Sequence, residues 1–328
     1  MAAPRHRRTG AAAVPRTAAA ALALLLPCVS GCVPHGPAEA RPALHDDIRS
    51  VGGQARAAGD DGDPGRARAA LRRAARLLAD AGGARVRTSM ETVSGGTRLT
   101  IRGAGEYDFA RPVGQLTVLV PADAAGSGEQ RAVTEVFAPG ALYMKNRGAG
   151  VPAGKWVRLA TPALPDGNLL TSGATDPLAA AELLGGARQV TYMRDERIDG
   201  VPVKHYWGTI DLGQAARLAP ERDRAPLAVA AKGFSGGTVA FDVYLDEQGR
   251  PRRLRHRFSV AERGAPDARS ARGARGGRVR GAPQAPLAPP APMSVVSTVE
   301  LDGFGTPVDV RLPAPADIYT GTVGSPRT

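Results

Sequence analysis

Cysteine is almost absent from this chain: 328 residues contain only Cys28 and Cys32. Both lie near the N-terminus, so no disulfide can cross-link the remainder of the chain. Zinc sites built on cysteine, iron–sulfur clusters and thiol catalysis are excluded there for the same reason. The chain must be stabilised by an ordinary apolar core, which a chain of this length can bury.

Histidine is also scarce, and the histidines show no metal-binding spacing. His35 and His45 lie in an irregular N-terminal stretch, and His205 and His256 lie in separate predicted strands. No H-x-H or H-x-x-x-H pair occurs, so the sequence does not indicate a metal centre.

Motifs for catalysis or cofactor binding are missing as well. Gly233–Gly237 matches the G-x-S-x-G pattern of serine hydrolases, with Ser235 as the serine. That pattern requires a strand before the serine and a helix after it, whereas here we expect the reverse order, which is typical of a turn. The acid pairs Asp46-Asp47 and Asp60-Asp61 lie in a flexible stretch. We therefore predict no enzyme and no cofactor.

The N-terminal apolar run is too short to span a bilayer. Ala18–Leu26 has about nine residues, against the roughly 18 that a spanning helix needs. Arginines precede this run and small residues follow it, as in a secretory signal peptide. Val29-Ser30-Gly31-Cys32 resembles the lipobox of bacterial lipoproteins, in which the cysteine is acylated. We expect a signal peptide over residues 1–31, lipidation of Cys32, and attachment to the extracytoplasmic face of the cell membrane. The alternative is an ordinary secretory signal with an incidental cysteine.

Acidic residues are fewer than basic ones, and lysine is nearly replaced by arginine. The formal charge is +12, and it falls to +8 when residues 1–31 leave with their four arginines. This charge is compatible with an anionic membrane or wall surface. A nucleic-acid partner is not expected, because aromatic residues make up only 4% and no reader motif is present.

Composition divides the mature chain into three parts, one of which contains an insertion. Residues 32–63 are rich in Pro, Gly, Ala and Asp and predict a flexible tether. Residues 64–320 carry the periodic pattern of a folded domain. Within it, residues 263–292 hold six arginines and nothing to bury, which indicates a disordered insertion. Residues 321–328 are a loose tail.

Periodicity predicts many strands and few helices. Asp63-Pro64 begins a helix that ends near Ala81, with Arg68, Arg72 and Arg76 on a solvated face. A second helix is predicted over 176–184, and further helical turns over 212–218 and 225–231. Alternating apolar residues predict antiparallel strands joined by short turns. They lie near residues 84–94, 97–101, 116–120, 131–138, 142–145, 154–159, 189–198, 201–211, 238–246, 251–260, 295–301 and 308–312.

Three segments resemble a known family: Asp176-Pro177-Leu178 to Leu184, Asp199 to Tyr206, and Tyr244 to Arg252. Their order is similar to that in actinobacterial lipoproteins of the LppX/LprG group, which share the fold of the LolA and LolB carriers. Leu142-Tyr143-Met144 followed by Gly154-Lys155-Trp156 is also similar to that group. The resemblance implies an α+β fold, in which short helices cover the concave side of a strongly curved antiparallel sheet, or half-barrel. It also implies a cavity for acyl chains of a lipid or lipoprotein.

Strand parity and residue type predict the lining of that cavity. A one-residue error in the register of a strand would turn all of its predicted lining residues outward. The predicted lining residues are Met90, Leu116, Val118, Val136, Leu142, Met144, Trp156, Tyr192, Trp207, Phe241, Val243 and Phe258.

The sequence thus predicts a monomeric, membrane-anchored lipoprotein that binds a lipid or acylated ligand without catalysis. The alternative is a cell-surface sensor or protein-interaction module on the same fold. Neither the lipid nor a protein partner is identified by the sequence.

Overall fold

The computed structural model describes residues 62–94, 97–121, 130–146, 150–260 and 293–321. The predicted signal peptide, Cys32, the tether up to residue 61, the insertion at 263–292 and the end of the tail lie outside the described residues. Among the helices of the described residues, none is long and apolar enough to cross a membrane.

Eleven antiparallel strands form one open sheet in the order β6-β5-β4-β3-β2-β1-β11-β10-β9-β8-β7. The first and last strands therefore pair in its middle, and the chain fills each half of the sheet in turn. The strands are β1 (Gly83–Ser94), β2 (Thr97–Asp108), β3 (Val113–Pro121), β4 (Gln130–Ala138), β5 (Ala141–Lys145), β6 (Trp156–Ala160), β7 (Ala187–Ile198), β8 (Val201–Asp211), β9 (Thr238–Asp246), β10 (Pro251–Val260) and β11 (Met293–Asp302).

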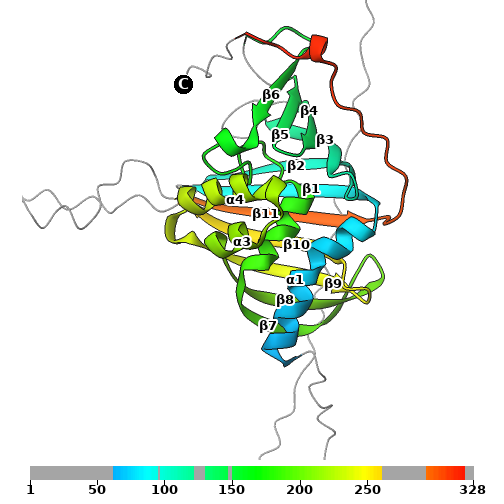
Figure 1. Cartoon of the computed structure of the whole chain (residues 1–328), viewed down its shortest axis with the longest axis vertical. Coiled ribbons are helices and arrows are strands. Elements are labelled where there is room, and N and C mark those ends of the chain that lie inside the picture. The colour runs from blue at the N-terminus through cyan, green and yellow to red at the C-terminus, as the bar shows by residue number, and fades with distance from the viewer. Residues whose placement is uncertain (1–61, 95–96, 122–129, 147–149, 261–292, 322–328) are drawn as a thin grey trace, which may run out of the picture. The chain divides into compact units, whose positions relative to one another are not determined.

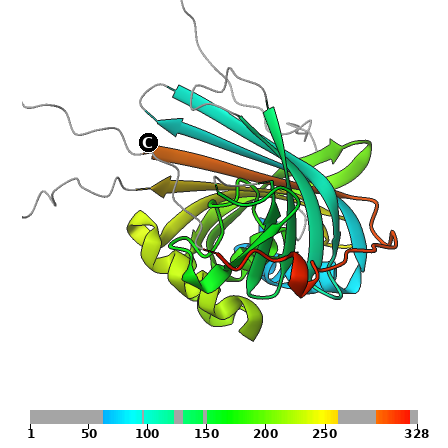
Figure 2. The ribbon, with the colours of Figure 1, turned by 90° about the horizontal axis from the view of Figure 1, so that it is seen from above.

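Four α-helices and several single 3-10 turns lie on one face of this sheet, which curves around them (Figures 1 and 2). Asp63 caps the first helix through its carboxylate, which accepts the Arg66 N–H at 2.8 Å, as the Asp-Pro signal predicts. The predicted curved antiparallel sheet with helices on its concave side is confirmed. The helical elements are α1 (Pro64–Asp80), α2 (Pro177–Glu182), η3 (Leu183–Gly186), α3 (Leu212–Leu218) and α4 (Glu221–Gly233), with the short turns η2 (Thr161–Ala163), η4 (Ser235–Gly237) and η6 (Pro315–Asp317).

Alternation along the strands separates an apolar concave face from a polar outer face. In β9, Val239, Phe241, Val243 and Leu245 belong to the core that the helices cover. Arginines and other polar residues occupy the intervening positions of the neighbouring strands and point the other way. This two-sided pattern is what an antiparallel sheet needs when only one face is covered.

The chain has to cross the concave face to reach its second half, because β6 and β7 form opposite edges of the sheet. We call residues 161–186, which make this passage, the crossover. Its Leu169, Leu178, Leu183 and Leu184 are buried in the core together with the concave strand residues. The centre of the concave face is therefore covered by the chain itself.

A buried pair of hydroxyls fastens the crossover to the sheet. Thr175 donates its hydroxyl to the Leu169 carbonyl at 2.8 Å, so Ser297 on β11 is the donor in the 2.6 Å Ser297–Thr175 bond. We expect Thr175→Val to lower the free energy of unfolding by about 2 kcal/mol, because it leaves the Ser297 hydroxyl and the Leu169 carbonyl without partners. Urea unfolding measures this. Ser297→Ala added to Thr175→Val should recover part of the loss, and strictly additive losses would contradict the pairing.

Two predicted elements require correction. The strand predicted over 308–312 is wrong: these residues are irregular and lie outside the sheet. Pro307 and Pro313 flank them, and a proline cannot donate to a strand ladder. The helical turn predicted over 225–231 belongs to a longer helix, α4, which begins at Glu221 because Glu221 and Asp223 favour a helix N-terminus.

Candidate functional site

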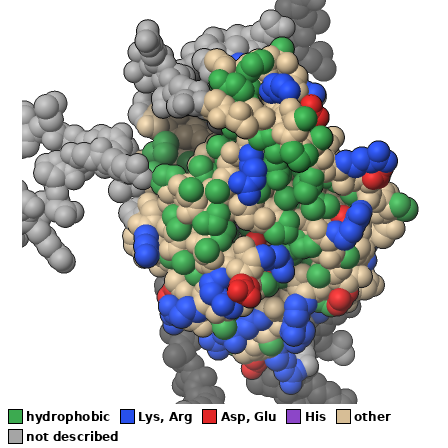
Figure 3. Space-filling model, turned by 45° about the horizontal axis from the view of Figure 1, so that its top comes forward, with side chains coloured by type: hydrophobic (Ala, Val, Ile, Leu, Met, Phe, Trp, Pro, Cys, Tyr) green, Lys and Arg blue, Asp and Glu red, His purple; other side chains and the backbone are tan. Residues whose placement is uncertain are grey.

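A groove of about 410 Å³ opens in the helical layer between α1, the end of the crossover and the α3–α4 link. This volume falls in the range of small-molecule sites. Its walls combine small apolar side chains with arginines, and hydrophobic side chains also gather over much of the helical face (Figure 3). The groove is lined by Arg72, Ala75, Arg76, Ala79, Ala181, Glu182, Gly185, Leu218, Ala219, Pro220 and Arg222.

The spacing of residues along α1 determines which of them form this helix's wall of the groove. Ala75 and Ala79 are four residues apart, as are Arg72 and Arg76, so each pair lies on one side of the helix. The alanines keep the wall shallow, and the exposed arginines stand at its border. No ion pair joins Arg72 or Arg76 to a carboxylate within the described ranges. We conclude that the groove suits an amphiphile with an apolar body and a negative head.

A buried charge cluster lies beneath the opposite wall. Arg222 contacts the carboxylate of Glu182 and also lies 2.9 Å, Nε to Oδ2, from Asp223. Nearby, the Tyr107 hydroxyl donates to Asp176 at 3.1 Å, and Asp176 also caps α2 through the N–H groups of Leu178 and Ala179. One guanidinium therefore contacts two carboxyl groups, Glu182 of the crossover and Asp223 of α4, and Asp176 lies near enough to Glu182 to affect its pKa.

Burial determines the protonation of this cluster. Burial first, and then the neighbouring Asp223, raise the pKa of Glu182 to about 9 against the opposing effect of Arg222. Burial likewise raises the pKa of Asp176 to about 6, with Asp223 contributing in the same direction. At neutral pH Glu182 is therefore protonated and adds no negative charge beside Arg222.

Nine of the twelve residues predicted to line a cavity point to the concave side. Eight of them are buried and Tyr192 is partly buried, and all except Met90 pack in the core that the helices and the crossover cover. That any of them contacts a lipid remains a prediction. They are Met90, Leu116, Val118, Leu142, Met144, Tyr192, Phe241, Val243 and Phe258.

The other three point to the outer face, so they cannot face the helices. Val136 pairs with Gln115 and Tyr143, Trp156 pairs with Lys145, and Trp207 pairs with Asp242. Each lies one position away from the residues of its strand that face the concave side. Residue type alone does not reveal this offset. Trp207 is 40% exposed, and Lys145 lies over the ring of Trp156 at 5.6 Å.

His256 is a polar residue in the concave interior. It is fully buried beside Phe258, and this desolvation lowers its pKa to about 4. Its Nε2 has no hydrogen-bond partner in the part of the chain that the structure describes. The ring is therefore neutral and behaves as part of the apolar face.

Two other sequence features have structural roles. His205, on the outer face of β8, lies 2.9 Å from both Glu196 and Asp242 and stacks on Tyr244. The segment Gly233–Gly237 joins α4 to β9, so a helix precedes Ser235 and a strand follows it. That order is opposite to the one in serine hydrolases.

The groove and its charges were missed by the sequence analysis. Arg72 and Arg76 had been assigned to a solvated face, and Glu182 and Arg222 were not selected at all. Arginines four residues apart beside alanines are common on exposed helices, so the α1 pattern alone cannot identify the groove. Its second wall comes from residues more than 100 positions away.

No protein-family model and no curated protein sequence matches the chain. Among solved structures, the chain is similar to LprF from Mycobacterium bovis (12% identity, TM-score 0.36, covering 76% of this chain and 98% of LprF). It is also similar to the lipoprotein LppX from Mycobacterium tuberculosis (12% identity, TM-score 0.37, covering 74% of this chain and 99% of LppX). A third neighbour is a LolA-superfamily protein from Nitrosomonas europaea (13% identity, TM-score 0.27, covering 72% of this chain and 91% of that protein). These neighbours are of the group that the sequence resembles, and the likeness concerns the fold alone.

Proposed function

We propose that this chain is a non-catalytic, monomeric lipoprotein that is anchored through Cys32 on the extracytoplasmic face of the membrane and binds an acyl chain. The observation that carries the proposal is the groove in the helical layer, with its alanine-lined wall and with Arg72 and Arg76, which form no ion pair within the described ranges. The apolar body of a lipid would lie against Ala75, Ala79 and Leu218. Its anionic head would meet Arg72 and Arg76.

The hydrophobic effect supplies the affinity in this proposal. Each methylene group that leaves water contributes about 0.8 kcal/mol, so a short buried segment of an acyl chain binds without any catalytic group. Residues beneath the groove extend the apolar region toward the concave strands, because Ala181 and Leu184 are buried in the same core. A longer acyl chain reaches those strands only if the crossover moves aside.

Filling the groove tests the proposal. We expect Ala79→Trp to weaken the binding of a fluorescent fatty acid by about tenfold or more, because the indole occupies the space of the acyl chain. The delipidated protein is titrated and the dissociation constant is measured. Ala69→Trp, at an exposed position of the same helix, is the matched control and should bind normally. Equal affinities for the two variants would refute the groove as the site.

A protein-interaction module is the second candidate, and the crossover favours it. The buried leucines of residues 161–186 occupy the concave face where a carrier would hold its ligand. Mass spectrometry of the purified protein distinguishes the two functions. A lipid-free protein that takes up neither fatty acid nor phospholipid, together with a stoichiometric protein partner, would favour the module.

A further inference from the structure

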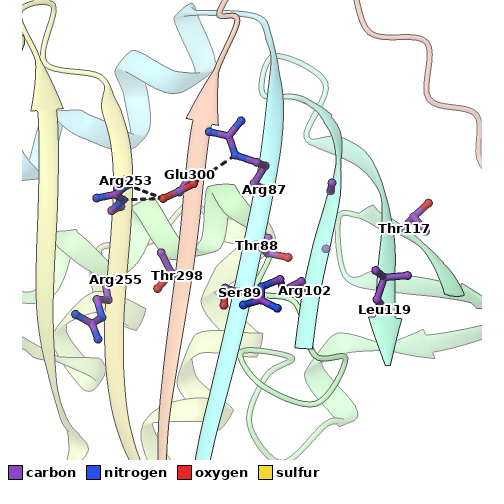
Figure 4. A pocket seen from close by; sticks show the side chains of 12 residues that line it. Arg87, Thr88, Ser89, Arg102, Thr117, Leu119, Arg253, Arg255, Thr298 and Glu300 are labelled. Carbon is purple, nitrogen blue, oxygen red and sulfur yellow. Dashed lines mark hydrogen bonds and ion pairs between the residues drawn. The ribbon is translucent and has the colours of Figure 1, made fainter. Parts of the chain in front are cut away.

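A second hollow, of about 720 Å³, lies on the outer face of the sheet, opposite the helices (Figure 4). Strands β3, β2, β1, β11 and β10 form its floor. Four arginines and one carboxylate line it, together with Leu119 and small or hydroxyl-bearing residues. We call this region the arginine hollow. Its lining residues are Arg87, Thr88, Ser89, Arg102, Gly103, Ala104, Thr117, Leu119, Arg253, Arg255, Thr298 and Glu300.

Strand register explains why the surface is hollowed. Arg102, Ser89, Thr298 and Arg255 are successive partners across β2, β1, β11 and β10. Two short hydroxyl side chains therefore lie between two long guanidinium side chains. The backbones of the two arginines are about 14 Å apart, at three strand spacings. The row offers cations at its ends and hydroxyl groups between them.

A second row, formed by Arg87, Glu300 and Arg253, is compensated by carboxylates, so the uncompensated positive charge lies in the first row. Glu300 accepts from Arg253 at 2.8 Å and from Arg87 at 3.4 Å, and Arg87 also donates to Asp302 at 2.8 Å and to Asp199 at 3.2 Å. Within the described ranges, no carboxylate lies at ion-pair distance from Arg102 or Arg255. Both side chains are exposed, and both are available to an external anion.

Large apolar side chains extend the first row at both ends. Leu119 pairs with Arg102, and beyond Arg255 the row continues through Asp242 to Trp207. Leu119 is 39% exposed and Trp207 is 40% exposed. Arginines flanked by exposed Leu and Trp are typical of surfaces that lie at a membrane interface, where cations meet phosphates and apolar side chains enter the headgroup layer.

We propose that the arginine hollow docks the protein on an anionic membrane surface, with Arg102 and Arg255 contacting phospholipid headgroups. Charge complementarity favours a bilayer, and the exposed Leu119 and Trp207 favour it over a soluble phosphate. The sequence predicts a flexible tether for the 29 residues between Cys32 and Gly62, and a flexible chain of that length reaches roughly 30 Å. The docked protein presents the helical groove away from the membrane. The proposal is independent of lipid binding in that groove.

Vesicle binding by an unacylated chain tests the docking. Residues 32–328 carrying Cys32→Ser are mixed with vesicles of phosphatidylcholine, with or without phosphatidylglycerol, and sedimented. We expect binding only to the anionic vesicles, and a loss of about 30-fold in partitioning for Arg102→Gln/Arg255→Gln, at about fivefold per arginine. Arg73→Gln/Arg158→Gln is the matched control, since both arginines are exposed and lie outside the hollow. The 263–292 insertion is identical in every variant.

Three outcomes would overturn the proposal. The first is an equal loss for the two double variants, which would assign binding to net charge alone. The second is equal binding to neutral vesicles. The third is complete competition by inorganic phosphate at the ionic strength of a matched chloride control, which would show a site for free phosphate and not for a bilayer. Circular dichroism confirms that each variant is folded.

Discussion

Glu182→Gln is expected to stabilise the protein at alkaline pH and to leave its stability nearly unchanged in mild acid. Burial raises the pKa of Glu182 in the folded state to about 9, whereas the unfolded chain keeps the ordinary value of 4.5. Folding therefore takes up a proton between these two values, and the stability of the protein falls as the pH rises through this range. Glutamine resembles the protonated carboxyl group and removes this dependence.

The expected gain is large. At about pH 8 the variant should exceed the parent by on the order of 3 kcal/mol, after allowance for the partial compensation by Arg222, and at about pH 5 the two should agree. Thermal unfolding at both pH values measures the difference. Glu221→Gln is the control, because Glu221 is exposed in the first turn of α4. Equal unfolding temperatures for Glu182→Gln and its parent at the alkaline pH would contradict a protonated Glu182.

Cys32→Ser is expected to release the protein almost completely from salt-washed membranes, in which electrostatic docking is screened. Acyl chains anchor through about 0.8 kcal/mol for each buried methylene, and no other part of the chain is predicted to insert so deeply. Cell fractionation in a bacterium that processes lipoproteins measures the distribution. Cys28→Ser is the matched control, because Cys28 is predicted to leave with the signal peptide. Retention of the Cys32→Ser protein in salt-washed membranes would disprove acylation as the anchor.

The binding consequences of these two changes are separable. Loss of the acyl group should not alter the affinity of the groove for a fatty acid, because the groove is built from α1, η3 and the α3–α4 link. Glu182→Gln keeps a hydrogen-bond acceptor for Arg222 at the groove wall. The anchor and the groove are thus independent parts of the proposed function.

Local patterns in the sequence were sufficient for most of the fold. The Asp63-Pro64 signal and the alanine–leucine period locate α1, and Asp199-Gly200 locates the β7–β8 turn, where both residues adopt positive φ. Such features depend on neighbouring residues only, and the physics of caps, turns and alternation is local. The Val308–Leu312 prediction failed because alternation without backbone partners does not make a strand.

The tertiary structure decided which side of the sheet each side chain faces and which side chains lie close together. Trp207 was assigned to the concave side from strand parity and residue type, but its pairing with Asp242 places it on the outer face. The groove and the arginine hollow join side chains from distant segments. The row from Arg102 to Arg255 exists only because β1 and β11, the first and last strands, pair in the middle of the sheet. Residue types determined that this chain would form a curved sheet with one apolar face. Strand order and register decided which side chains meet, because these depend on contacts between residues far apart in the chain.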